Sequence, residues 1–282
     1  MMQIIEQVVA GENGRKMPVT VRYQEKSDSR LPVILFCHGF KGFKDWGAWN
    51  LMGSAFAKAG YLFISFNYSH NGGTIQDPID FPDLEAFGNN NYSIELRDTI
   101  RILDWITSSQ LPVDSNKLYL MGHSRAGGIA TLVASRDHRL SGLITLAGVA
   151  CYRSRFPREE ALELWEEQGV YYIKNGRTQQ SMPLYYQFFQ DFQLHENNLD
   201  IKKAASKLAI PHLIIHGTLD PTVNFTDAVE LSKSSPHSEL LLLPGANHVF
   251  GACHPWESTN LPPDLKQVVQ CALNWLSKTT MQ

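Results

Sequence analysis

The stretch LYLMGHSRAGG, residues 118–128, decides how the rest of this 282-residue chain is interpreted. An apolar run ends at Gly122, Ser124 follows two residues later, and small residues continue after it. This order is typical of a strand that turns sharply into a helix and exposes the serine hydroxyl at the turn. A bare G-x-S also occurs about once by chance in a chain of this length. The surrounding sequence therefore has to decide between a nucleophile and an ordinary helix-capping serine.

Buried strands and helices alternate on both sides of this stretch. Apolar runs predict strands at residues 32–39, 61–68, 117–122, 142–148, 212–217 and 239–245. Helical patterns lie at residues 49–59, from Ser93, at 125–136, from about Phe225 and at about 263–277. Residues 4–10 and 19–24 alternate in polarity around a turn, which predicts an antiparallel hairpin. The pattern favours an α/β fold with a mostly parallel central sheet and helices on both faces.

One connection is much longer than the others. About 60 residues separate the sixth predicted strand, 142–148, from the strand at 212–217, whereas α/β connections usually hold one helix and short loops. Residues 157–169 begin with proline and two acids and end at glycine, as a capped helix does. We expect residues 150–209 to form a helical cap or lid within a single domain, 1–282. An insert that only adds core or a dimer contact is the alternative.

Two residues that could act with Ser124 follow it in a definite order. Asp220 comes just after the strand at 212–217, and His248 just after the strand at 239–245. Open parallel sheets place their sites at these strand ends. A serine hydroxyl needs a base to take its proton and a group to orient that base. We predict Ser124 as nucleophile, His248 as base and Asp220 as acid, with His254 and Asp227 as alternatives for the last two.

An ester or amide carbonyl that is attacked by serine also needs donors for its oxyanion. The strand at 32–39 ends in His38-Gly39, and Gly39 lets the main chain turn close to a substrate. The backbone N–H groups of Phe40 and Arg125 are the predicted donors. An ordinary turn glycine is the alternative interpretation of Gly39.

Four stretches together resemble the α/β-hydrolase superfamily over nearly the whole chain: HGFKGFKDW (38–46), GHSRAGG (122–128), HGTLDPTV (216–223) and GANHVF (245–250). The HGF stretch with its short polar loop, and the insert after the sixth strand, are most similar to the dienelactone-hydrolase-like and cinnamoyl or feruloyl esterase-like branch. The resemblance implies an α/β-hydrolase fold, cleavage of carboxylic esters and the residue roles given above.

Two residues depart from the pattern of that branch. Ala126 stands where the elbow usually has its last glycine, and it adds a methyl group where backbones pack closely. Ser124 stands where dienelactone hydrolases use cysteine, which argues against a dienelactone substrate.

Other functions on related frameworks differ in what they need. A prolyl-oligopeptidase-like peptidase usually carries a large propeller, and a dehalogenase or epoxide hydrolase would have aspartate at position 124. An acyltransferase, a perhydrolase or a small peptidase would share the whole triad, so these stay open beside a serine esterase. A non-catalytic binding protein usually loses a triad residue, whereas all three are present here.

The substrate pocket is less well defined by sequence. Tyr185, Tyr186 and Phe189 are predicted to line it, with packing inside the cap as the alternative. Lys41 and Lys44 follow the predicted oxyanion turn, where they could meet an acidic substrate or simply face solvent.

Composition limits the partners. The net charge of −3 and the scattered Lys and Arg argue against nucleic acid. No signal peptide pattern and no bilayer-length apolar run are present, so no membrane partner is expected. Four scattered cysteines predict reduced thiols, a cytoplasmic protein and no structural zinc, although His248, Cys253 and His254 lie close in sequence. We expect a small-molecule ester substrate, no metal and no organic cofactor; the sequence carries no signal for subunit number.

Overall fold

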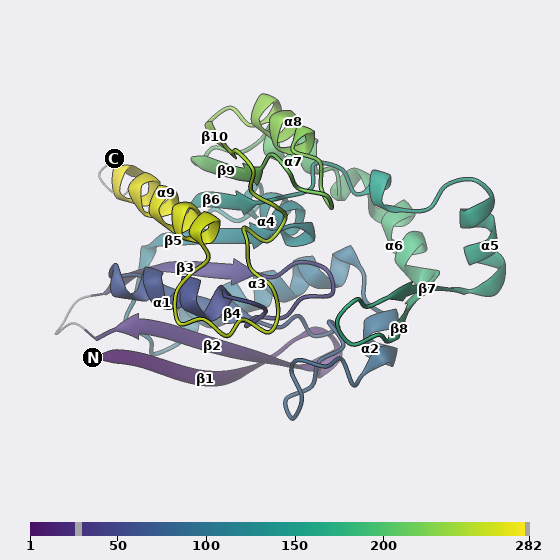
Figure 1. The fold of residues 1–282 in the computed structure, drawn as a ribbon, viewed down its shortest axis with the longest axis horizontal. Coiled ribbons are helices and arrows are strands. Elements are labelled where there is room, and N and C mark those ends of the chain that lie inside the picture. The colour runs from purple at the N-terminus through teal and green to yellow at the C-terminus, as the bar shows by residue number, and fades with distance from the viewer. Residues whose placement is uncertain (26–29, 280–282) are drawn as a thin grey trace.

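An eight-stranded sheet, in the order β1-β2-β4-β3-β5-β6-β9-β10, forms the centre of the computed structural model, which describes residues 1–25 and 30–279 (Figure 1). Its strands are β1 (Met2–Ala10), β2 (Lys16–Gln24), β3 (Leu31–Cys37), β4 (Leu62–Phe66), β5 (Val113–His123), β6 (Leu140–Leu146), β9 (His212–Gly217) and β10 (Ser238–Leu243). Strands β4, β3, β5, β6, β9 and β10 pair in parallel in that order, and β2 pairs antiparallel with β1 and β4. The predicted, mostly parallel sheet with an N-terminal hairpin is confirmed.

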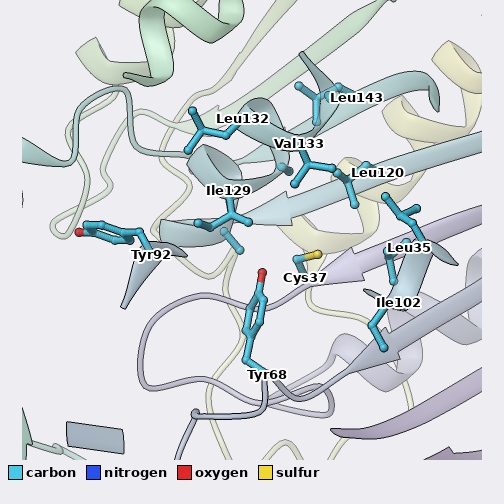
Figure 2. Close-up of a cluster of buried hydrophobic side chains, with 14 of the residues drawn as sticks. Leu35, Cys37, Tyr68, Tyr92, Ile102, Leu120, Ile129, Leu132, Val133 and Leu143 are labelled. Atoms are coloured by element: carbon cyan, nitrogen blue, oxygen red, sulfur yellow. The ribbon is translucent and has the colours of Figure 1, made fainter. Parts of the chain in front are cut away.

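Helices cover both faces of the sheet because successive side chains of a buried strand point to opposite sides. On one face, α1 (Trp49–Lys58) and α9 (Pro263–Thr279) share a core with Ile34 and Phe36 of β3. On the other, α3 (Tyr92–Ser108), α4 (Arg125–Ala134) and α8 (Thr226–Ser234) share a core with Leu35. Figure 2 shows part of that second core, where Leu35, Ile102 and Ile129 gather in one cluster. None of the helices within the described residues is both long and apolar enough to cross a bilayer.

The start of α3 differs from the prediction. The sequence pattern predicts that the helix begins at Ser93, but Asn91 caps it. The side-chain oxygen of Asn91 accepts a hydrogen bond from the N–H of Ile94 at 2.9 Å. Asparagine is among the strongest N-cap residues. Ser93 instead donates its hydroxyl to Asp191 of the insert at 2.9 Å. The polar stretch before α3 also contains a short helix, α2 (Leu84–Gly88), which Asp83 caps.

Most of the insert, residues 150–209, lies beyond the ends to which the parallel strands point: α5, β7, β8 and α6 are at the right of Figure 1, whereas α7 returns to lie beside α4 and α8. It holds η2 (Arg153–Arg155), α5 (Glu160–Gln168), β7 (Val170–Lys174), β8 (Ser181–Tyr185), α6 (Gln187–His195), η3 (Glu196–Asn198) and α7 (Ile201–Ala205). Helix α5 ends at Gly169, whose left-handed φ of 71° fits the predicted cap. The insert is not wholly helical, however, because β7 and β8 pair as an antiparallel ribbon. Their aromatic and branched residues suit a strand better than a helix.

Candidate active site

Ser124 occupies the turn between β5 and α4 with φ 57° and ψ −121°. This region of backbone space is strained for a residue that has a Cβ atom, so neighbouring contacts have to hold it. The N–H of Ser124 donates to the carbonyl of Leu146 at 2.9 Å, and its carbonyl accepts from the N–H of Gly127 at 2.9 Å. The serine thus sits at the carboxyl end of a central strand, with 8% of its surface exposed.

Close backbone contacts explain the glycines around this turn. A Cβ added to Gly122 would lie 2.2 Å from the carbonyl oxygen of Ala126, and one added to Gly127 would lie 2.7 Å from the Cα of Gly148. Ala126 itself is fully buried in the core of the α4 face. The position at which the helix backbone approaches a neighbouring strand end most closely is therefore Gly127 and not residue 126. The methyl group of Ala126 fits into the core.

His248 and Asp220 lie in line with Ser124. Nε2 of His248 is 3.0 Å from Oγ of Ser124, and Nδ1 of the same ring is 2.7 Å from Oδ2 of Asp220. The loops after β5, β9 and β10 bring these three side chains together, although 124 residues separate Ser124 from His248. With Nδ1 bonded to a carboxylate, the tautomer that leaves Nε2 free to accept a proton is favoured.

The side chain of Asp220 is fully buried and remains ionised because several donors face it. Oδ1 accepts from the N–H groups of Thr222 at 2.8 Å and Val223 at 2.9 Å. Burial raises the pKa of Asp220, but hydrogen bonds from His216 and His248 outweigh burial and hold that pKa well below its ordinary value. The carboxylate is therefore charged at neutral pH and can stabilise a protonated His248.

Two further histidines contact this group, and the sequence analysis missed both. Nε2 of His123 lies 2.9 Å from the carbonyl oxygen of His248, and burial lowers the pKa of His123 to about 3, so the ring is neutral. Nε2 of His216 lies 3.2 Å from Oδ2 of Asp220, and His216 is fully buried. Both stand inside motifs that the sequence displayed, GHS and HGTLD, but a motif does not reveal which way a neighbouring ring points.

The alternative base and acid are engaged elsewhere. Nδ1 of His254 accepts from the N–H of Gly47 at 2.9 Å. Oδ2 of Asp227 accepts from the N–H of Ala150 at 3.0 Å and from Arg155 at 2.8 Å. Within the described residues, no group of three His, Cys, Asp or Glu side chains is placed to hold a metal ion.

The two predicted oxyanion donors border Ser124. A Cβ added to Gly39 would lie 2.9 Å from Cβ of Ser124, so the loop that carries Phe40 touches the serine. Arg125 is the first residue of α4, where a helix leaves its N–H groups without intrahelical partners. In residues 1–25 and 30–279, neither the Phe40 N–H nor the Arg125 N–H donates to a protein acceptor. Both can therefore serve a substrate oxygen.

The side chains of these two residues also stack on each other. The guanidinium carbon of Arg125 lies 3.8 Å from the centre of the Phe40 ring, and Nη1 donates to Oε1 of Glu95 at 3.2 Å. Burial raises the pKa of Glu95, while the Arg125 charge opposes that rise. The stack of Arg125 on Phe40 ties the start of α4 to the loop after β3, and the pair with Glu95 ties it to α3, so the two backbone donors are fixed relative to each other.

A cavity of about 610 Å³ opens beside Ser124 and His248. Its walls come from the loops after β3, β9 and β10, the start of α4 and the insert, and nine of the 26 lining residues are Phe, Trp or Tyr. The aromatic lining residues are Phe40, Trp46, Trp49, Tyr92, Tyr152, Phe156, Trp165, Tyr171 and Phe188. A cavity of this size and character suits a small apolar or aromatic molecule.

None of the three predicted pocket residues lines this cavity. The hydroxyl of Tyr185 donates to Glu85 at 2.5 Å, and Tyr186 packs on the ring of Trp165. Phe189 is buried among the aromatic rings of the insert. Leu184 and Phe188, each one position away, reach the cavity instead. The reason is direction: neighbouring residues of a strand point to opposite sides, and neighbouring residues of a helix point about 100° apart.

Comparison with known proteins agrees with this architecture. The family model of the alpha/beta hydrolase fold matches residues 32–174, which run from β3 to the end of β7. Lysophosphatidylserine lipase ABHD12 of Xenopus tropicalis is 27% identical over 114 residues, which cover 40% of this chain and 26% of that protein. The match thus spans about a quarter of that relative.

Solved structures resemble the chain over nearly its whole length. Est1E from Butyrivibrio proteoclasticus with bound ferulic acid has a TM-score of 0.76 at 16% identity and covers 98% of this chain and 100% of its own. The esterase domain of a Rhodothermus marinus protein has 0.65 at 15%, covering 97% of both chains. A dienelactone hydrolase from Anabaena variabilis has 0.63 at 16%, covering 98% of both. These likenesses are in the fold and match the branch that the motifs resemble. With its family match, its sheet order and its strand-end residues, the chain belongs to the α/β-hydrolase fold family.

Proposed function

We propose that the protein is a serine hydrolase that cleaves carboxylic esters of small molecules through an acyl-enzyme intermediate. The observation that carries the proposal is the line of contacts from Asp220 through His248 to Ser124 at the wall of an apolar cavity. A neutral serine is a weak nucleophile, and an adjacent base with an orienting acid is the arrangement that activates it.

In the first half of the reaction, Oγ of Ser124 attacks the ester carbonyl while its proton passes to Nε2 of His248. The carbonyl oxygen becomes an oxyanion that accepts hydrogen bonds from the N–H groups of Phe40 and Arg125. The intermediate then collapses: the bond between the carbonyl carbon and the alcohol oxygen breaks, and the alcohol takes the proton from His248. An acyl group remains on Ser124.

In the second half, water replaces the alcohol. His248 takes a proton from the water, and the hydroxyl attacks the acyl carbon through a second oxyanion at the same donors. The bond to Oγ breaks, Ser124 regains the proton from His248, and the carboxylic acid leaves. The charged Asp220 stabilises the protonated His248 in both halves without itself exchanging a proton.

Esters are favoured over other acyl compounds by the relatives. The matching structures include an esterase domain and Est1E with bound ferulic acid, and the matching sequence is that of a lipase. Acyl transfer to an acceptor other than water, or amide cleavage by a small peptidase, would use the same groups.

We also propose that residues 1–282 form one domain in which residues 150–209 act as a cap. The insert residues that line the cavity support this proposal.

The test combines labelling with product analysis. A fluorophosphonate probe is expected to label the folded protein once, on the peptide that contains Ser124, and Ser124→Ala is the matched control. Release of free acid from an ester in the presence of added alcohols and amines would favour hydrolysis over transfer. No labelling of Ser124 in folded protein would contradict the proposal and favour a binding protein on this fold.

A further inference from the structure

The charged side chains that line the cavity are all cationic. Within the described part of the chain, Lys41, Arg125, Arg155 and Arg177 line it, and no Asp or Glu does. Four positive groups around one low-dielectric space raise the local potential and attract anions. Because the whole chain has a net charge of −3, this polarity is a property of the cavity and not of the protein surface in general.

Three of these cations have carboxylate partners, but the partners stand outside the cavity wall. The pairs are Arg125 with Glu95 at 3.2 Å, Arg155 with Asp227 at 2.8 Å, and Arg177 with Asp80 at 2.5 Å. Each pair therefore presents its positive end inward. An ion pair produces a much weaker electric field in the cavity than a free charge does. Because the positive ends of these pairs face inward, the field still favours an anion over a cation in the cavity.

Lys41 is different from the three arginines. In residues 1–25 and 30–279, no carboxylate oxygen lies within 4.0 Å of its ammonium, which donates to the carbonyl oxygen of Lys174 at 3.2 Å. An ammonium group has three donors, so the remaining ones can serve a ligand. Half-burial lowers the pKa of Lys41, which is the expected result for a cation that has lost water without gaining a counter-ion.

Lys41 lies where the cavity wall meets the β7–β8 hairpin of the insert. It follows Phe40, a predicted oxyanion donor, and its ammonium reaches the last residue of β7. Asn175 and Arg177, just after β7, line the same cavity. A ligand held at Ser124 and at Lys41 would lie along the aromatic wall between the loop after β3 and the hairpin of the insert.

We infer that the ester cleaved at Ser124 carries a remote anionic group, a carboxylate or a phosphate, that binds Lys41 at the hairpin end of the cavity. This inference rests on the proposed function, since it names the substrate class of that site. A charge-assisted hydrogen bond of this kind is expected to favour the anionic ester over a neutral isostere on the order of tenfold to a hundredfold.

The probes are methyl hemiesters of linear dicarboxylic acids with three to eight methylenes. Each is compared with the monoamide that replaces its free carboxylate and with the phosphonate that replaces it by a phosphate-like group. Hydrolysis by the intact protein is expected to give a lower KM for the anionic probes than for the amides at one chain length. The preferred anion distinguishes a carboxylate from a phosphate. The preference should shrink as salt is added.

Lys41→Met is the test variant, because it keeps the length of the side chain and the Cβ at a position with φ 56° while removing the charge. Lys174→Met is the matched control: Lys174 is exposed, lies next to the same contact and does not line the cavity. The anionic preference is expected to disappear in the first variant and to persist in the second. Equal KM values for hemiester and amide in the wild type, or a preference that survives Lys41→Met, would overturn the inference.

Binding separates this inference from the proposed function. Ser124→Ala keeps the cavity and cannot cleave the probes, so calorimetry on it measures affinity alone. If Ser124→Ala binds the hemiester more tightly than the amide, and if the double variant Ser124→Ala/Lys41→Met binds the two equally, the anion site is supported even if the wild type cleaves no ester. Equal binding of the two overturns the anion site even if ester cleavage at Ser124 is found. If Lys41→Met fails to fold, Lys41→Gln replaces it as the variant without charge. The comparison of hemiester and amide in the wild type then tests the anion site in the same way.

Discussion

Two regions of the molecule hold their side chains in different ways. We call the loops after β3, β5, β9 and β10 the strand-end loops; hydrogen bonds of the backbone hold their side chains in place. In the insert, aromatic rings that pack against each other hold the side chains in place. Ser124 is fixed by hydrogen bonds of its own main chain to β6 and α4, and Asp220 by the N–H groups of two following residues. In the insert, the Phe156 ring lies within 6.2 Å, measured between centres, of four other rings of the insert and of the ring of Tyr92 in α3.

This difference predicts different results of substitution. In the strand-end loops, the backbone sets the geometry, so changing a side chain is expected to alter chemistry more than folding. In the insert, the side chains themselves set the geometry, so removing a ring is expected to alter folding first. Four experiments test or refine this contrast, beginning with the largest expected effect.

Ser124→Ala and His248→Ala are each expected to lower kcat by about 10⁶-fold, and the double variant should be scarcely worse, because the groups act as one unit. The free energy of unfolding should change by about 1 kcal/mol or less in Ser124→Ala, as for a single hydrogen bond, and by about 1–3 kcal/mol in His248→Ala, because the buried Asp220 loses a donor. Ester turnover and urea unfolding measure the two quantities. His254→Ala is the control and should keep near-normal turnover; the opposite result would make His254 the base.

Asp220→Asn is expected to lower kcat by about 10⁴-fold, because the amide cannot stabilise a protonated His248 or hold its tautomer. Here some loss of stability is also expected, since His216 faces the same oxygen. Asp227→Asn is the matched control, because Asp227 pairs with Arg155 outside the line of three residues. Normal turnover in Asp220→Asn together with a large loss in Asp227→Asn would show that the acid has been misassigned.

Phe188 and Phe189 are neighbours in α6 that face different surroundings. Phe189→Ala is expected to cost about 3–5 kcal/mol of unfolding free energy, because it removes a ring from the packed interior of the insert. The ranking of esters by kcat/KM should stay unchanged. Phe188→Ala should also destabilise the protein, but it should change the ranking, because Phe188 lines the cavity. If the ranking of esters changed in Phe189→Ala and not in Phe188→Ala, the contrast between the two residues would be wrong.

Acid is expected to destabilise the sheet through its buried histidines. Burial lowers the pKa of His38 to about 4 and that of His123 and His212 to about 3, against about 6.5 for an unfolded histidine. Since the folded pKa is depressed, the unfolded chain binds more protons below pH 6.5, and the stability gained by holding these rings neutral is lost as the pH falls toward 4.

Each such histidine contributes up to about 1.4 kcal/mol per pH unit in that range. Urea unfolding at pH 7, 6 and 5 measures the slope, and His212→Asn should reduce it without changing ester turnover at pH 7. His212 is the first residue of β9, at the opposite end of the strand from Asp220, and its ring contacts Thr145 and Ser235. A slope that is unchanged in His212→Asn would exclude this ring as a source of acid sensitivity.

The alternation of apolar runs and helical patterns predicted the α/β class, the parallel sheet, the hairpin and the position of the insert. These features depend on local periodicity and on short connections, both of which can be read along the chain. The order of Ser124, Asp220 and His248 after successive strands likewise predicted that they would share one edge, since parallel strands end on the same side of a sheet.

Only the tertiary structure decided which neighbours of those residues matter. Leu184 and Phe188 line the cavity while Tyr185 and Phe189 do not, because a shift of one residue reverses the direction of a strand side chain and turns a helix side chain by about 100°. The contacts of His123 and Lys41 join segments far apart in sequence, so no local pattern reports them. His216 lies only four residues before Asp220, but its contact depends on the turn that the chain makes between them. The sequence determined which residues reach the end of the sheet, and the packing of the insert determined what surrounds them there.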